Sequence, residues 1–338
     1  MHGAKKDVPS TVDVPHTHRP GRHCGSSAIR DLLEFHGLTL TEAFCFGLGA
    51  GLGITYVEIP GTDTPFIVHV RSMGFEETLF STLGVPFRWE TWQDKCAAAD
   101  ALDAHLDAGR PALLLTDIFY LPYFKSSTHF PGHAIVAWQR AERGETVLVS
   151  DTERPGLLEV PRDKLVEARF SLSPPFIHHG SLFAPESVSV QVSAEKVRSA
   201  IVRNADNLLQ GSRNHGIQAL TTWIQELPRW KAVNKWQWLL RFAYQVIEKR
   251  GTGGGGFRVM YSEFLDEASE IVPEIHEAGL VELMRTSAAA WSALADCLRK
   301  GSESETFPEE AITDAIESLR AAETRYADAA STLLYKSS

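Results

Sequence analysis

Three residues far apart in the sequence, Cys24, His133 and Asp151, are of the types that nucleophilic acyl chemistry uses. In that chemistry an imidazole takes the thiol proton, the thiolate attacks an acyl carbon to form a thioester, and a carboxylate fixes the imidazole tautomer and orientation. Each type is also common without such a role, since a cysteine can pack in a core and a histidine or aspartate can end a strand. The interpretation therefore depends on elements that bring the three side chains together.

Cys24 lies where a helix is expected to begin. Apolar residues at positions 28, 29, 32 and 33 have helical spacing, and Gly37 is a typical stop. A thiol in the first turn lies near the positive end of the helix dipole and near unpaired backbone N–H groups, which favour the thiolate. We expect the Cys24 N–H to form half of an oxyanion hole, and His18 or His23 in the preceding loop to supply the other half.

His133 and Asp151 are predicted to lie on two paired strands. His133 opens a strand over 133–138, a turn is expected at 142–145, and a second strand covers 146–151. With a three-residue loop (142–144), Asp151 lies diagonally opposite His133 on the same face of the sheet. With a two-residue loop (143–144), the two side chains would lie on opposite faces of the sheet, and a β-bulge would be needed to return them to one face.

Two further segments are candidates for substrate binding. Glycine occupies every second position from 47 to 53, without the Lys-Ser/Thr of a phosphate-binding loop. The glycines either mark a backbone crossing too tight for Cβ atoms or, as we favour, let Gly49 and Gly51 approach a ligand arm beside Cys24. The aromatic loop with Tyr120 and Tyr123 is predicted to line a pocket, although it could instead cover the core.

Composition narrows the class of protein. The net charge of −10 is spread over both halves of the 338 residues, which argues against nucleic-acid binding. No apolar run approaches the ~18 residues of a membrane span, and no signal pattern opens the chain. The four cysteines, at positions 24, 45, 96 and 297, lack paired spacing, so we expect a cytoplasmic protein without a disulfide framework.

No metal site is expected near the cysteine. His16, His18, His23 and Cys24 crowd together, but their spacing matches no structural zinc pattern and no second ligand pair follows. We interpret these residues as a polar loop that precedes the helix.

The character of the sequence changes near residue 180. We expect a mobile arm at 1–15, a catalytic domain at 16–180 and an α-helical domain at 181–338. The glycine run at 251–256 is interpreted as a hinge or as a close approach to the catalytic domain. Arg241 and Arg258 are either phosphate or carrier contacts, or simply solvated.

Several motifs in order resemble the N-terminal domain family of butirosin biosynthesis protein H over about residues 15–175. They are His23-Cys24-Gly-Ser-Ser, the 46–54 glycine repeat, Tyr120-Leu-Pro-Tyr123, Gly132-His133 and Ser150-Asp151. The family is similar in fold to bacteriocin-processing cysteine peptidases of the papain-like superfamily. The resemblance implies an α+β fold, with a cysteine-bearing helix packed on an antiparallel sheet and a mostly α-helical C-terminal domain.

The resemblance also implies an activity. Cys24 would be the nucleophile, His133 the base and Asp151 the orienting carboxylate, while His18 stands near the place of the upstream glutamine of papain-like enzymes. An acyl group would pass from an acyl carrier protein thioester to Cys24 and then to an amine of an aminoglycoside-like acceptor. Phosphopantetheine would be the substrate arm, and no cofactor is implied.

Other outcomes stay open. An internal amine would make the protein a cyclase, water as acceptor would make it a cysteine peptidase or amidase, and a degenerate fold would only bind a partner. A homodimer is also left open.

Overall fold

The computed structural model describes residues 18–62, 64–141, 144–174 and 176–333. The arm predicted at 1–15, His16 and part of the turn predicted at 142–145 lie outside these residues. The chain has an α+β fold, as predicted, and divides into two compact units. Unit 1 contains the described residues up to Thr39 together with Phe87–Ser189, and unit 2 contains Leu40–Pro86 and the described residues from Val190 onward.

Unit 1 is built on a five-stranded antiparallel sheet with strand order β6-β5-β4-β3-β7. The strands are β3 (Ala112–Thr116), β4 (His133–Arg140), β5 (Thr146–Ser150), β6 (Leu158–Pro161) and β7 (Leu182–Phe183). Every residue of β3 and the first six residues of β4 are buried. This agrees with their nearly continuous apolar sequence, which is typical of strands covered on both faces.

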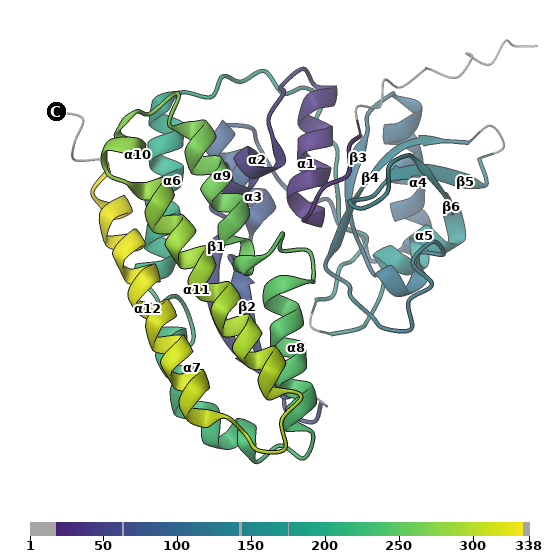
Figure 1. The fold of residues 1–338 in the computed structure, drawn as a ribbon. Coiled ribbons are helices and arrows are strands. Elements are labelled where there is room, and N and C mark those ends of the chain that lie inside the picture. The colour runs from purple at the N-terminus through teal and green to yellow at the C-terminus, as the bar shows by residue number, and fades with distance from the viewer. Residues whose placement is uncertain (1–17, 63, 142–143, 175, 334–338) are drawn as a thin grey trace, which may run out of the picture. The chain divides into compact units, whose positions relative to one another are not determined.

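Helices cover this sheet (Figure 1). They are α1 (Cys24–Phe35), α4 (Lys95–Asp107) and α5 (Arg162–Arg169), with the short 3-10 helix η1 (Ile118–Tyr120) after β3. Leucines of α4 and α5 join one core cluster with alternate residues of β3, β4 and β5. Helix α1 packs against β4, where the ring of Phe35 meets the edge of Trp138 at 6.0 Å. The sheet therefore holds the N-terminus of α1 and the start of β4 within one unit.

Unit 2 combines a two-stranded hairpin with helices. Its elements are α2 (Glu42–Leu48), β1 (Leu52–Glu58), β2 (Phe66–Arg71), α3 (Phe75–Leu83), α6 (Ala194–Leu209), α7 (Gln218–Lys231), α8 (Trp236–Glu248), η2 (Gly255–Phe257), α9 (Arg258–Ala268), α10 (Glu274–Glu277), α11 (Leu280–Gly301) and α12 (Glu309–Ser331). The long helices α11 and α12 pack against each other. The C-terminal region is helical, as predicted.

The compact units do not follow a single boundary near residue 180. Residues 40–86 belong with the C-terminal helices because Asn204 of α6 fixes the backbone around the end of α2 and the start of β1. Its side-chain amide donates to the carbonyl of Gly47 at 2.9 Å and accepts from the N–H of Leu52 at 2.9 Å. Asn204 is fully buried, so both bonds satisfy polar groups that have no access to water.

Arg258 is neither solvated nor placed for a phosphate, contrary to both interpretations from the sequence. Its side chain is 0% exposed, and its Nε donates to Glu323 at 2.7 Å. Its Nη1 donates to the carbonyls of Val70 at 2.7 Å and Gly256 at 2.6 Å. The glycine run at 251–256 thus supplies a carbonyl to a buried cation within unit 2.

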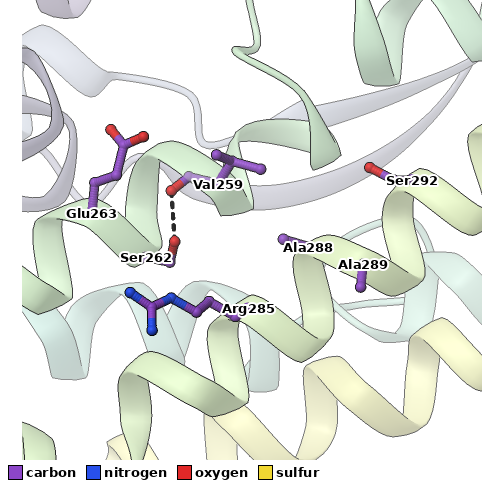
Figure 2. A pocket seen from close by; sticks show the side chains of 7 residues that line it. All are labelled: Val259, Ser262, Glu263, Arg285, Ala288, Ala289 and Ser292. Carbon is purple, nitrogen blue, oxygen red and sulfur yellow. Dashed lines mark hydrogen bonds between the residues drawn. The ribbon is translucent and has the colours of Figure 1, made fainter.

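A surface pocket of about 460 Å³ lies between α9 and α11 (Figure 2). Its lining includes Ser262, whose hydroxyl donates to the carbonyl of Val259 at 2.8 Å, as Figure 2 shows. Val259 also lines the pocket, and the remaining lining residues are Glu263, Arg285, Ala288, Ala289 and Ser292. No site residue predicted from the sequence is among them. Among the described residues, no helix combines the length and the apolar character that a membrane crossing requires.

Candidate active site

The pairing of β4 with β5 meets the register requirement stated from the sequence. Ala137 lies opposite Val149, and a β-bulge shifts the register between Ala137 and Gln139. Before the bulge, the pairing sets position 153 opposite His133 and leaves Asp151 diagonally across from it. Beyond the bulge, the register is the one that a two-residue loop requires. The hairpin therefore adopts the bulged alternative, which returns the two side chains to one face.

Cys24 occupies the first turn of α1, as predicted. The preceding residue, His23, is the N-cap, and its Nδ1 accepts from the Ser26 N–H at 3.2 Å. Because that lone pair is used, the proton of a neutral His23 ring resides on Nε2. The N–H groups of the first helical turn, including that of Cys24, have no acceptor within the helix. This is the geometry that an oxyanion hole uses.

The side chains of His133 and Asp151 form a hydrogen-bonded pair in unit 1, and Cys24 interacts with the His133 ring. His133 Nε2 lies 2.9 Å from both carboxylate oxygens of Asp151. Cys24 lies close enough to the His133 ring to help raise the pKa of the imidazole. The side chains of His133 and Asp151 are 9% and 2% exposed, so their interaction is poorly screened by water.

The electrostatics favour an imidazolium beside the thiol. Burial alone would lower the pKa of His133, but the charge of Asp151 and the hydrogen bonds with Asp151 and Cys24 raise it from 6.5 to about 10. Burial would raise the pKa of Asp151, but His133 and the hydrogen bond from Tyr123 hold it below its ordinary 3.8. A protonated ring next to Cys24 stabilises a thiolate, which is the nucleophilic form of cysteine.

Tyr123 and Tyr120 differ in their contacts, although the sequence grouped them as pocket residues. The Tyr123 hydroxyl donates to Asp151 Oδ2 at 2.6 Å. Tyr120 is partly buried, packs against the core cluster of unit 1 and meets Phe119 edge-on at 5.1 Å. The link from Tyr123 to the carboxylate could not be predicted from the sequence, because it depends on how the loop folds back.

His18 is hydrogen-bonded at both ring nitrogens. Nδ1 lies 2.5 Å from Asp31 Oδ2, and Nε2 lies 2.6 Å from the carbonyl of Arg154. Burial would lower the pKa of His18, but the hydrogen bonds to Asp31 and Arg154 raise it above 6.5, which favours an imidazolium donating to both oxygens. Both nitrogens are therefore used within the protein. Asp31 also accepts from Arg30 at 2.8 Å, a buried pair on α1 that no sequence pattern indicated.

The glycines near position 50 pack against phenylalanine rings within unit 2. A Cβ atom on Gly49 would lie 2.3 Å from the ring of Phe75, and one on Gly51 would lie 2.5 Å from the ring of Phe46. Atoms that are not bonded cannot approach so closely. The tight-packing interpretation thus accounts for both glycines without a ligand.

No group of three or more His, Cys, Asp and Glu side chains is arranged to hold a metal ion within the described part of the chain. The four cysteines are free thiols, and Cys24 is partly exposed. The site itself offers a thiol, an imidazole and a carboxylate.

Comparisons with known families match most of the chain. Residues 23–152, which include Cys24, His133 and Asp151, match the family described as Butirosin biosynthesis protein H, N-terminal. Residues 163–330 match a family described as Domain of unknown function (DUF4872). No curated protein matches the chain.

Proposed function

Because residues 23–152 match the family described as Butirosin biosynthesis protein H, N-terminal, we propose that the chain is a cysteine-dependent acyltransferase of antibiotic biosynthesis. The observation that carries the proposal is the buried pair of His133 and Asp151, hydrogen-bonded at 2.9 Å, with Cys24 beside the imidazole. The family description supports the role in antibiotic biosynthesis. The chain of polar groups supports acyl transfer through a thioester on Cys24.

In the first half-reaction, the Cys24 thiolate attacks the carbonyl carbon of an acyl thioester. The bond between the acyl carbon and the Cys24 sulfur forms, and the bond to the pantetheine sulfur breaks. The imidazolium of His133 gives its proton to the departing thiol. The Cys24 N–H stabilises the oxyanion that develops on the carbonyl oxygen. His18 uses both ring nitrogens within the protein, so it does not supply a second donor to this oxyanion.

In the second half-reaction, an amine attacks the acyl-Cys24 thioester. Neutral His133 accepts a proton from the attacking nitrogen, an amide bond forms, and the bond to the Cys24 sulfur breaks. Asp151 holds the His133 ring in place through both steps. The donor would be an acyl carrier protein, and the acceptor a small molecule with an amine, such as an aminoglycoside. An amine on the acyl chain itself would give a cyclic product.

The proposal is tested by intact-mass spectrometry with acetyl-pantetheine as donor and an aminoglycoside as acceptor. We expect an acetyl adduct on Cys24 that the acceptor discharges to an acetylated aminoglycoside. Cys24→Ala should form no adduct. Asp151→Asn should form it at least roughly tenfold more slowly, because the imidazole loses its orientation while the base remains.

Each alternative outcome has its own interpretation. An adduct lost to water at the same rate with and without the amine would indicate a hydrolase. Wild-type rates in Cys24→Ala and His133→Ala would overturn the assignment of these residues to the chemistry. Cys96→Ala is the matched control, since this cysteine is exposed and lies outside the group formed by Cys24, His133 and Asp151.

A further inference from the structure

The carboxylate of Asp151 is held by three donors. His133 Nε2 approaches both oxygens, the Thr152 N–H donates to Oδ1 at 2.6 Å, and the Tyr123 hydroxyl donates to Oδ2 at 2.6 Å. His133 lies on β4, and Thr152 lies just beyond the end of β5. Tyr123 comes from a separate segment, the loop at 118–130 between β3 and β4. Tyr123 can hold the Asp151 carboxylate in place only if this loop is itself held in place.

Asp117 fixes the base of this loop. Its Oδ1 accepts from the N–H of Phe119 at 3.1 Å, where the loop leaves β3, and from the N–H of Phe130 at 2.9 Å, where it returns. Its Oδ2 accepts from His129 at 2.7 Å and Ser171 at 2.6 Å. Asp117 is fully buried, so these bonds are shielded from water. The two ends of the loop are thus held together at one carboxylate.

Arg154 and Phe124 fix the tip of the loop. The Arg154 guanidinium lies 5.9 Å from the ring centroid of Tyr123 and 6.0 Å from that of Phe124, within the range of cation–π attraction. The edge-on contact of Phe124 with His133 has a centroid distance of 5.1 Å. The loop tip therefore touches both the carboxylate and the imidazole.

We infer that Tyr123 is a positioning residue, which holds the Asp151 carboxylate so that His133 keeps the orientation needed to exchange a proton with Cys24. This inference rests on the proposed function and assigns Tyr123 a part in it that differs from substrate contact. Without the hydroxyl, the carboxylate is held only by His133 and Thr152, so it can turn more readily about its Cβ–Cγ bond. The hydroxyl also stabilises the ionised carboxylate, because burial and the charge of Asp151 raise the pKa of Tyr123 and keep its proton in place.

The experiment measures the rate at which iodoacetamide alkylates Cys24, followed by mass spectrometry of its peptide at pH values from 4 to 9. Tyr123→Phe removes only the hydroxyl and should slow Cys24 alkylation about tenfold, the scale of one hydrogen bond to a charged group. The acid limb of its pH profile should move to higher pH, because Asp151 takes up a proton more readily. Ser126→Ala is the matched control, since it removes a hydroxyl of the same loop that bonds within the loop.

A double variant separates positioning from general support of the fold. In an Asp151→Asn background, Tyr123→Phe should add no further loss, because the group through which Tyr123 acts is already changed. Additive losses, or a Tyr123→Phe profile that coincides with that of Ser126→Ala, would overturn the inference. The failure of the proposed function looks different. In that case, wild-type Cys24 would react no faster than exposed Cys96 near neutral pH.

Discussion

In unit 2 the guanidinium of Arg258 meets the carboxylate of Glu323 with both side chains 0% exposed, and in unit 1 the imidazole of His133 meets Asp151 with 9% and 2% exposed. Both are buried cation–carboxylate pairs. They differ in the cation, because a guanidinium keeps its proton at any physiological pH and an imidazole can give it up.

The surroundings reinforce this difference. Glu323 Oε1 accepts from Arg258, from Ser287 at 2.8 Å and from Trp291 at 2.6 Å, and Arg258 also donates to three backbone carbonyls. Every contact made by this pair joins parts of the unit 2 core. His133 instead lies beside the Cys24 thiol, with which it can exchange its proton. Burial of charge alone does not identify a reactive site, whereas a transferable proton beside a nucleophile does.

The largest effect should come from Glu323→Gln. The variant leaves Arg258 buried without a counter-charge, which costs about 3–5 kcal/mol of unfolding free energy. Urea unfolding followed by tryptophan fluorescence measures the loss. The control is Glu303→Gln, whose partner Arg241 is 3.5 Å away and whose side chain is 59% exposed. It should change stability by about 0–1 kcal/mol. Equal losses of unfolding free energy in the two variants would contradict the assignment of Arg258 and Glu323 as a buried pair that differs from an exposed one.

Gly51→Ala should have the next largest effect. The new Cβ would lie 2.5 Å from the ring of Phe46, which is fully buried, and relief requires the ring to move. Overpacking of this kind costs about 1–3 kcal/mol in urea unfolding. Gly156→Ala is the control, because no atom lies within 4 Å of its added Cβ.

The same variant decides between the two interpretations of the glycine run. If packing is the whole role of Gly51, the folded variant should form the acetyl adduct on Cys24 at the wild-type rate. Unchanged stability together with slower adduct formation from acetyl-pantetheine would instead favour the ligand-arm interpretation.

The sequence predicted those features that depend on local pattern. Helical spacing and a stop placed Cys24 in a first turn. Strand alternation left two hairpins possible, a three-residue loop or a two-residue loop with a β-bulge, and the pairing of β4 with β5 contains the bulge. Features that depend on distant partners could not be predicted. Nothing near Arg258 in the chain indicates that Glu323 lies against it, and nothing near Tyr123 indicates that Asp151 accepts its hydroxyl. The close packing at Gly49 was hidden for the same reason, since the ring it meets comes from another helix, α3.

His18 gives the smallest expected effect in the comparison between the permanent cation of unit 2 and the titratable cations of unit 1. It is a buried cation that can lose its proton. Its pKa is raised above 6.5 by the hydrogen bonds to Asp31 and Arg154, against the lowering effect of burial. A group whose pKa is higher in the folded state stabilises the fold fully below its unfolded pKa, and this stabilisation is lost as the pH rises through the folded pKa. The stability difference between wild type and His18→Gln should therefore be largest below pH 6.5 and shrink above it. One proton limits the slope to about 1.4 kcal/mol per pH unit.

Urea unfolding of both proteins between pH 5.5 and 9 measures this difference, and subtraction removes the titration of all other groups. The difference between wild type and Glu323→Gln should stay constant over the same range, because a guanidinium does not titrate within it. A His18→Gln difference that grows with pH would mean that folded His18 is neutral, and a constant difference would mean that its pKa does not change on folding. It would then resemble an ordinary core histidine, and the contrast between the permanent cation of unit 2 and the titratable cations of unit 1 would rest on His133 alone.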